Sequence, residues 1–178
     1  MRDLQGAPKL FGTAATAKAL AINRVAAQQI LSAEVPGETF QDDRGSFLAH
    51  SADVERLAER ELIEPAERAL QVKVTTATWE DAEQRWRGWH RRLPKGVRRD
   101  GVRGWWSVRN PEGLVGGLFI ATMSGFVVEV ARITGYETAY GKRNFTLDDA
   151  EESVQEQYLA ARLPPQPGSV ISLWHTHK

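Results

Sequence analysis

This chain of 178 residues lacks cysteine, long apolar runs and a signal-peptide pattern. It has no cysteine, which excludes disulfides, thiol nucleophiles and zinc sites with cysteine ligands. It has no apolar run approaching the roughly 18 residues of a membrane-spanning helix and no signal-peptide pattern. We therefore expect a soluble, cytoplasmic protein with no membrane partner. Basic and acidic residues balance at 23 each, so affinity for a polyanion has to come from a local patch.

Recognisable catalytic frames are also missing. The sequence has no phosphate-binding glycine loop, no nucleophile elbow and no carboxylate pair in a familiar spacing. We expect no enzymatic activity and no cofactor. Hydrophobic residues make up 42% of the chain, enough for buried cores. The length allows two small domains, which we predict at residues 1–63 and 64–178.

The first predicted domain begins with two helices joined by a tight turn. Thr13 is expected to cap a helix through Leu20, and Asn23 a second helix, Arg24–Leu31. The turn between them is Ala21–Asn23. Small or apolar residues recur at threes in the first helix, which allows close helix packing. They are Ala14, Ala17 and Leu20. The inward face of the second helix comprises Ala27, Ile30 and Leu31.

The outward face of the second helix has the residue types that recognise base edges in a major groove. Arginine can form two hydrogen bonds with guanine, glutamine with adenine, and valine can contact a thymine methyl. Asn23, at the helix N-terminus, lies where a phosphate can bind. The outward set consists of Arg24, Val25, Gln28 and Gln29.

Two short strands and a third helix complete this domain. Two short strands are predicted at residues 38–41 and 46–49, on either side of the turn Asp42–Gly45, and together they predict a hairpin. Ser51 is expected to cap the third helix, whose apolar face comprises Val54, Leu57 and Ala58.

This arrangement resembles the winged helix-turn-helix of the MerR and excisionase-type regulators. The matching positions are Thr13, Ala17, Leu20, Ile22, Asn23, Arg24, Ile30, the wing tip Arg44-Gly45 and the closing Ser51–Ala58. The resemblance implies binding to double-stranded DNA, with Arg44 as the wing contact. The sequence departs from the pattern at Ala21, where such turns usually have glycine, and in the two aspartates of the wing tip.

The second predicted domain is α+β, with a small curled antiparallel sheet between two helices. Tryptophans at spacings of three and four predict a helix over residues 78–93, ended by Pro94. Strands are expected at residues 71–76, 105–108, 118–122, 126–133, 142–147 and 169–174, with a loop at 135–141. A second helix is expected at residues 148–163, with Val154, Tyr158 and Leu159 inward.

The segment from Arg85 to Arg109 contains nine basic residues and a single acid, Asp100. Gly96 and Gly101 would let this run bend and follow a phosphate backbone or enter a minor groove. A solvated loop would explain the same composition. The expected DNA contacts in this run are Arg91, Arg92, Lys95, Arg98, Arg99 and Arg103.

A metal-dependent enzyme is the alternative to a DNA-binding protein. Glu129 together with His175 and His177 resembles the start of the JAMM metalloprotease pattern. That pattern also requires a serine and an aspartate after the second histidine, and the sequence reaches only Lys178, so we expect no zinc site of that kind.

Together these features predict a sequence-specific DNA-binding regulator, such as a phage-type repressor or an excision factor. The second domain would either form a homodimer on paired half-sites or provide a second DNA contact for a monomer. The basic run favours the second role. A truncated metalloprotease-like domain and a protein-interaction adaptor remain the competing interpretations.

Overall fold

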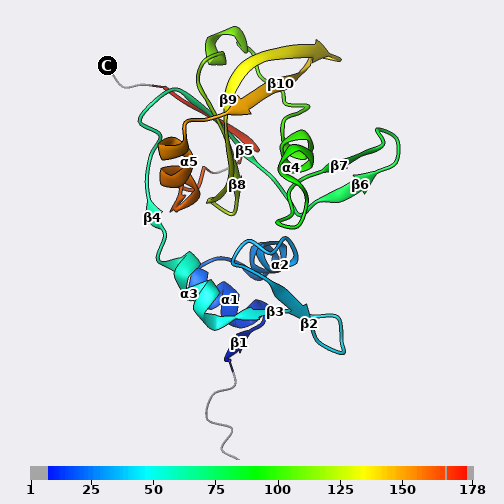
Figure 1. The fold of residues 1–178 in the computed structure, drawn as a ribbon, viewed down its shortest axis with the longest axis vertical. Coiled ribbons are helices and arrows are strands. Elements are labelled where there is room, and N and C mark those ends of the chain that lie inside the picture. The colour runs from blue at the N-terminus through cyan, green and yellow to red at the C-terminus, as the bar shows by residue number, and fades with distance from the viewer. Residues whose placement is uncertain (1–7, 167, 176–178) are drawn as a thin grey trace, which may run out of the picture. The chain divides into compact units, whose positions relative to one another are not determined.

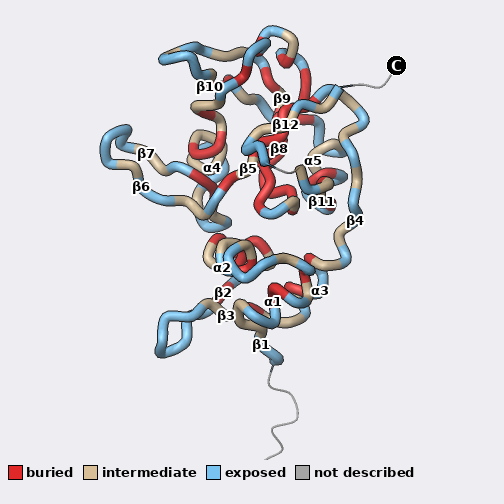
Figure 2. The backbone as a smooth tube through the Cα atoms, turned by 180° about the vertical axis from the view of Figure 1, so that it is seen from behind, coloured by how far each residue is buried: buried red, intermediate tan, exposed pale blue. Residues whose placement is uncertain are grey.

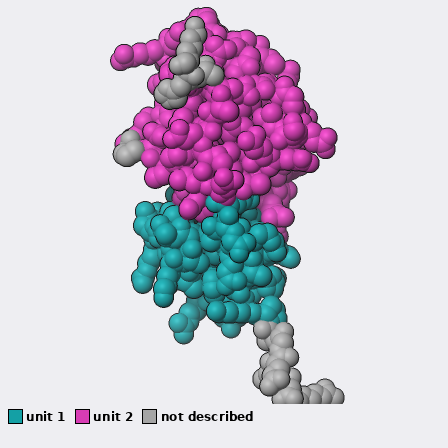
Figure 3. Space-filling view, turned by 90° about the vertical axis from the view of Figure 1, so that its left-hand side faces the viewer, with its two compact units in different colours: residues 1–60 teal, residues 61–178 magenta. Residues whose placement is uncertain are grey.

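The computed structural model describes residues 8–166 and 168–175. The chain divides into two compact units, residues 1–60 and 61–178, which we describe separately (Figures 1 and 3). Among the described residues, five α-helices accompany three sheets, none of them closed. The α+β class predicted from the sequence is confirmed at this level.

The helices of the first unit are short and closely packed. They are α1 (Thr13–Leu20), α2 (Arg24–Ser32) and α3 (Ser51–Ala58). Between α1 and α2, Ala21 has φ 53°, a left-handed conformation that normally favours glycine. The N–H of Ile22 donates to the carbonyl of Ala17 at 3.0 Å and closes the end of α1. The turn therefore keeps its glycine-type geometry although alanine stands there.

Two helix starts and one apolar stripe differ slightly from the sequence prediction. Gly12 and His50 are the N-cap residues of α1 and α3, one position before the predicted Thr13 and Ser51. In α1, Ala14 was predicted to lie on the apolar face but is exposed, and Thr16 is buried instead. The core of the unit follows the prediction at the other positions: Ala17, Leu20, Ala27, Ile30, Leu31, Val54 and Leu57.

A three-stranded antiparallel sheet accompanies these helices, in the order β1 (Leu10–Phe11), β3 (Phe47–His50), β2 (Thr39–Gln41). The predicted hairpin is β2 and β3, whereas β1 was not anticipated. At the hairpin tip the carboxylate of Asp42 accepts the N–H groups of Arg44 (2.9 Å) and Ser46 (2.8 Å). One of the two aspartates of this turn therefore stabilises the turn itself.

The second unit is built on a seven-stranded sheet. Its order is β12 (Ile171–Trp174), β5 (Ala69–Lys73), β8 (Leu118–Met123), β9 (Phe126–Ala139), β11 (Ala161–Arg162), β4 (Glu61–Leu62), with β10 (Lys142–Asp149) on β9. The predicted antiparallel sheet is wrong in two places, because β5 pairs with β8 and β11 with β4 in parallel. A parallel pair needs a long crossover, and residues 74–117 form the one between β5 and β8. Since β4 joins this sheet, residues 61–63 lie in the second unit rather than the first.

The core of this unit lies on β8 and the first half of β9. Every residue of β8 is buried, which Figure 2 shows as a continuous red segment. Helix α5 (Glu152–Leu159) adds Tyr158 to this core. The predicted helix over residues 148–163 was too long, because Asp148 and Asp149 end β10. Leu159, predicted to face inward, is 38% exposed.

The tryptophan-rich segment is a hairpin and not the predicted helix. Trp79 in β6 (Thr78–Glu80) lies opposite Trp86 in β7 (Arg85–Arg87), with ring centroids 5.7 Å apart. Gly88 then turns the chain back with φ 97°, where a Cβ would lie 2.7 Å from the carbonyl oxygen of Thr75. A spacing of seven places two side chains on one helix face, but it also suits opposite positions of a hairpin with a four-residue loop. The remaining tryptophan of the predicted face, Trp89, is buried.

Three further predictions changed in the crossover and beyond it. Part of the basic run forms helix α4 (Lys95–Val102), which has Pro94 as its N-cap and contains both glycines expected to bend the run. The predicted strand at residues 105–108 is reduced to a single bridge between Trp106 and Arg143. The predicted loop at residues 135–141 is mostly strand, because β9 continues to Ala139.

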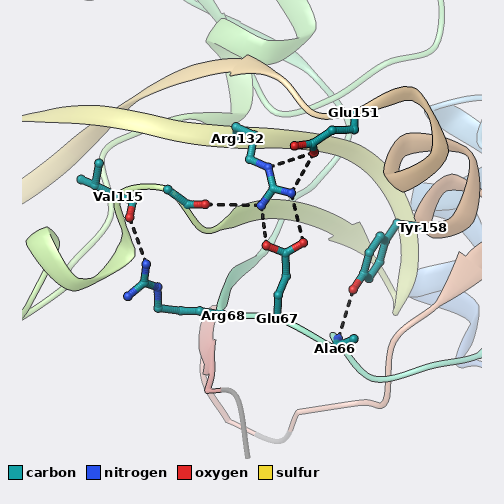
Figure 4. A network of polar contacts seen from close by, with 8 residues as sticks. Ala66, Glu67, Arg68, Val115, Arg132, Glu151 and Tyr158 are labelled. Carbon is teal, nitrogen blue, oxygen red and sulfur yellow. Dashed lines mark hydrogen bonds and ion pairs between the residues drawn. The ribbon is translucent and has the colours of Figure 1, made fainter.

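The connection that leads into β5 is held by a polar network (Figure 4). Arg132 of β9 forms hydrogen bonds with Glu67 on one side and with Glu151 at the start of α5 on the other. These carboxylates raise the pKa of Arg132 above its usual range. The hydroxyl of Tyr158 accepts the N–H of Ala66 at 3.3 Å. The charged segment 64–68 is therefore anchored to the sheet of its own unit.

Candidate nucleic-acid interface

Helix α2 combines a buried face with an exposed polar one. Ala27, Ile30 and Leu31 are completely buried. Arg24, Val25 and Gln28 are exposed, and Gln29 is half-buried. Val25 is 70% exposed. The exposed face thus presents a guanidinium, amides and a branched methyl group in two turns of helix.

Asn23 fixes where this helix begins. Its side-chain oxygen accepts the N–H of Ala26 at 2.8 Å, as the sequence predicted for an N-cap. The asparagine side chain is therefore occupied by its own helix. The backbone N–H groups that follow it keep the positive end of the helix dipole available for an anion.

The tip of the β2–β3 hairpin presents one cation. Arg44 is exposed at the turn between β2 and β3, beside the exposed Asp43. The carboxylates of Asp42, which accepts the N–H of Arg44, and of the exposed Asp43 place negative charge near this cation.

In the second unit, the basic residues differ in how far their charge is compensated. Arg98 and Arg99 of α4 approach the carboxylate of Glu129 at 3.9 and 3.5 Å. Arg99 and Lys95 also contact Asp149, at 2.7 and 2.8 Å. These contacts attach α4 to strands β9 and β10.

The remaining basic positions lie at the two ends of α4. Arg103 pairs with Asp100 at 2.7 Å, one turn back along the chain. Arg91 and Arg92 are exposed in the turn that precedes α4. Of the residues expected to contact phosphate, Lys95, Arg98, Arg99 and Arg103 form ion pairs with carboxylates.

Glu129 is the buried carboxylate among the partners of α4. It is 5% exposed, within the apolar strand β9, and burial raises the pKa of its carboxyl group although Arg98 and Arg99 lower it. Arg98 also lies 5.5 Å from the ring centroid of Trp89, a cation–π distance. A lone acid within the apolar run Phe126–Ala131 is the sequence signal for a cationic partner, whereas Glu129 was considered from the sequence only within the metalloprotease-like pattern.

The residues of the metal alternative lie only partly within the described chain. Within residues 8–166 and 168–175, no group of three histidine or carboxylate side chains is arranged to hold a metal ion. His175 is exposed just after β12, and His177 lies outside the described residues. Glu129 contacts the guanidinium groups of α4.

No family model, curated protein or solved structure matches this chain. In the part of the chain that the structure describes, no helix combines the length and apolar character needed to cross a membrane. The function proposed below therefore depends on the residues and their geometry.

Proposed function

We propose that this protein binds double-stranded DNA sequence-specifically, with its first unit acting as a winged helix-turn-helix. The exposed face of α2 is the observation that supports this proposal most. This face combines the exposed Arg24, Val25 and Gln28 with the half-buried Gln29, opposite a fully buried face. These are residue types that can recognise base edges from a helix in the major groove.

Each residue of this face has a distinct role in the proposal. Arg24 donates two hydrogen bonds to a guanine, and Gln28 or Gln29 pairs with an adenine. Val25 contacts a thymine methyl group. The N-terminus of α2 at Asn23 lies against a phosphate, and Arg44 at the wing contacts the backbone beside it.

The basic residues of the second unit provide a further, sequence-independent contact with phosphates. Arg91 and Arg92 are the main candidates because they are exposed. Lys95 can join them, since its pair with Asp149 is exposed on both sides (47% and 60%) and such pairs are weak. Arg98, Arg99 and Arg103 contribute to the local positive potential while they stay paired with carboxylates.

Regulation of transcription is the role that fits such a protein, as a phage-type repressor or an excision factor. A reading unit joined to a second unit with its own basic patch suits a monomer on a long asymmetric site. A homodimer on two half-sites would instead give a palindromic site.

Selection of bound fragments from randomised duplex DNA tests the proposal directly. We expect a defined motif to be enriched, and we expect sedimentation of the complex to show one chain per asymmetric site. A palindromic motif with two chains would replace the monomer by a dimer. If no motif is enriched over unselected DNA, the proposal of sequence-specific binding is wrong, and the result favours a protein-interaction adaptor.

A further inference from the structure

A cleft of about 530 Å³ lies within the second unit, and its lining includes neither Arg91 nor Arg92. It is formed by the end of β5, the end of β7, the segment after α4, the start of β10 and the start of β12. Ligand sites in proteins usually enclose about 300–1,000 Å³. The size therefore suits a small organic molecule and is too confined for a stacked duplex.

The lining of this cleft is cationic. Lys73, Arg87 and Lys142 contribute to it, and no aspartate or glutamate does. The ammonium group of Lys73 donates to the carbonyl of Gln166. Among the described residues, no carboxylate forms an ion pair with Arg87 or Lys142. The cleft therefore holds a positive potential that an anionic group would neutralise.

A neighbouring cleft of about 570 Å³ differs from the first in the charged residues that line it. Trp105 and Lys142 line both clefts, but the second also contains Glu83 and Asp100. There Arg85 pairs with Glu83 and Arg103 with Asp100. Positive charge in the second cleft is largely compensated, so the first cleft is the better anion site.

Two adjacent tryptophans give the cationic cleft aromatic surface. Trp106 is fixed by backbone hydrogen bonds to and from Arg143, both 2.8 Å, and its indole N–H donates to the carbonyl of Val102 at 3.0 Å. Trp105 is half-buried. An aromatic surface of this kind can stack against a planar ring.

The cleft also depends on close backbone packing. Gly88 and Gly101 are both part of its lining, and a Cβ on Gly101 would lie only 2.5 Å from the carbonyl oxygen of Gly88. The N–H of Gly88 donates to the carbonyl of Gly101 at 2.9 Å. The wall at this point is therefore held in place by the main chain, as expected for a pre-formed site.

We propose that this cleft binds a single nucleotide, with the base against Trp105 and the phosphate between Arg87 and Lys142. A planar aromatic ring joined to a phosphate matches both properties of the lining, whereas a simple anion uses only one. The nucleotide can come from two sources: a free mononucleotide acting as an effector, or a nucleotide turned out of a DNA strand. Only the second source rests on the DNA-binding function proposed above, and it requires the base to leave the stack.

Calorimetric titration of the full chain with the four deoxynucleoside 5′-monophosphates and with inorganic phosphate tests this assignment. We expect at least one mononucleotide to bind saturably and more tightly than phosphate. Trp105→Ala should weaken that binding on the order of tenfold, because it removes the aromatic surface on which the base stacks. Trp105→Phe should retain most of the affinity. Trp79→Ala, at a 47%-exposed tryptophan outside the cleft, should change it less than about twofold.

Arg87→Glu and Lys142→Glu are the second pair of variants. Both side chains are exposed, so these variants should fold normally even if Trp105→Ala does not. Each should weaken mononucleotide binding and reduce its dependence on salt. The proposal is overturned if no mononucleotide saturates, or if these charge reversals leave the affinity unchanged.

A second experiment distinguishes a free mononucleotide from a nucleotide turned out of a DNA strand. A duplex with one unpaired, bulged nucleotide is compared with the same duplex fully paired. Tighter binding of the bulged duplex, lost in Lys142→Glu, identifies a strand nucleotide. Equal binding of both duplexes, with saturable mononucleotide binding, identifies a free effector. Failure of the DNA-binding proposal is distinct, because it would abolish fully paired duplex binding while mononucleotide binding persists.

Discussion

At the scale of single residues, Asn23 links the sequence pattern most directly to the proposed function. It closes the first turn of α2 through the N–H of Ala26, and it thereby fixes the direction in which Arg24 and Gln28 project. The cap was foreseeable because N-cap preferences depend on local backbone groups and not on distant contacts.

Asn23→Ala should lower the free energy of unfolding by about 1 kcal/mol, since the orphan N–H of Ala26 loses its acceptor. Asn23→Asp keeps an acceptor and serves as the matched control. Urea denaturation followed by circular dichroism measures both. Equal loss in the two variants would show that the hydrogen bond does not matter.

Glu129 gives a prediction about pH. Burial raises the pKa of its carboxyl group in the folded chain above the unfolded value, so the native state binds this proton more strongly. The stability contributed by this group is therefore complete below the ordinary glutamate range near about 4.3, and it is lost as pH rises through the raised pKa. Glu129→Gln cannot titrate.

The unfolding free energy of Glu129→Gln, relative to the unchanged chain, should therefore increase as pH rises through that window. Denaturation curves of both proteins at a series of pH values measure the difference. A difference that stays constant with pH, or decreases, would contradict a raised pKa at Glu129.

At the scale of elements, the sequence was most informative where structure is decided locally. The bounds of α1 and α2 were predicted to within a residue, because caps and helical periodicity lie within a few residues of each other. The β6–β7 hairpin was missed because the spacing of Trp79 and Trp86 fits a helix as well. The parallel pairing of β5 with β8 could not be foreseen, since these strands are brought together by a crossover of more than forty residues.

The two glycines of α4 offer a matched test of this part of the fold. Gly101→Ala should destabilise the protein by about 1–3 kcal/mol, because its Cβ would meet the carbonyl oxygen of Gly88 at 2.5 Å. Gly96→Ala in the same helix has no atom within 4 Å, and it should be neutral or stabilising by up to about 1 kcal/mol. Thermal unfolding compares them. Similar effects of both would show that α4 does not pack on Gly88.

At the scale of the whole molecule, a net charge of zero conceals an uneven distribution of charge. The stretch from Arg85 to Arg109 has nine basic residues and one acid, so the remainder of the chain is acidic. The candidate contacts could be named from the sequence as residue types on an expected helix face or in a charged run. Which of them pair with carboxylates could not, because Glu129 and Asp149 are distant in sequence from α4.

Arg91→Ala should therefore weaken DNA binding about equally for all sequences and reduce the slope of log affinity against log salt by about 1. Arg99→Ala should affect stability more than the salt slope, since its side chain is only 15% exposed and contacts Asp149. Fluorescence anisotropy at several salt concentrations distinguishes them. A larger change of slope in Arg99→Ala than in Arg91→Ala would reverse this assignment.

The central claim is that the exposed face of α2 recognises DNA sequence, and the affinity of α2 variants for the selected duplex tests it most directly. Arg24→Ala and Gln28→Ala should each cost about 1–3 kcal/mol, roughly 5- to 150-fold in affinity, and relax preference at one base pair. Arg56→Ala, at a 72%-exposed arginine of α3, is the matched control and should stay within about twofold. If Arg24→Ala and Gln28→Ala both keep the affinity and sequence preference of the unchanged chain, α2 is not the recognition helix.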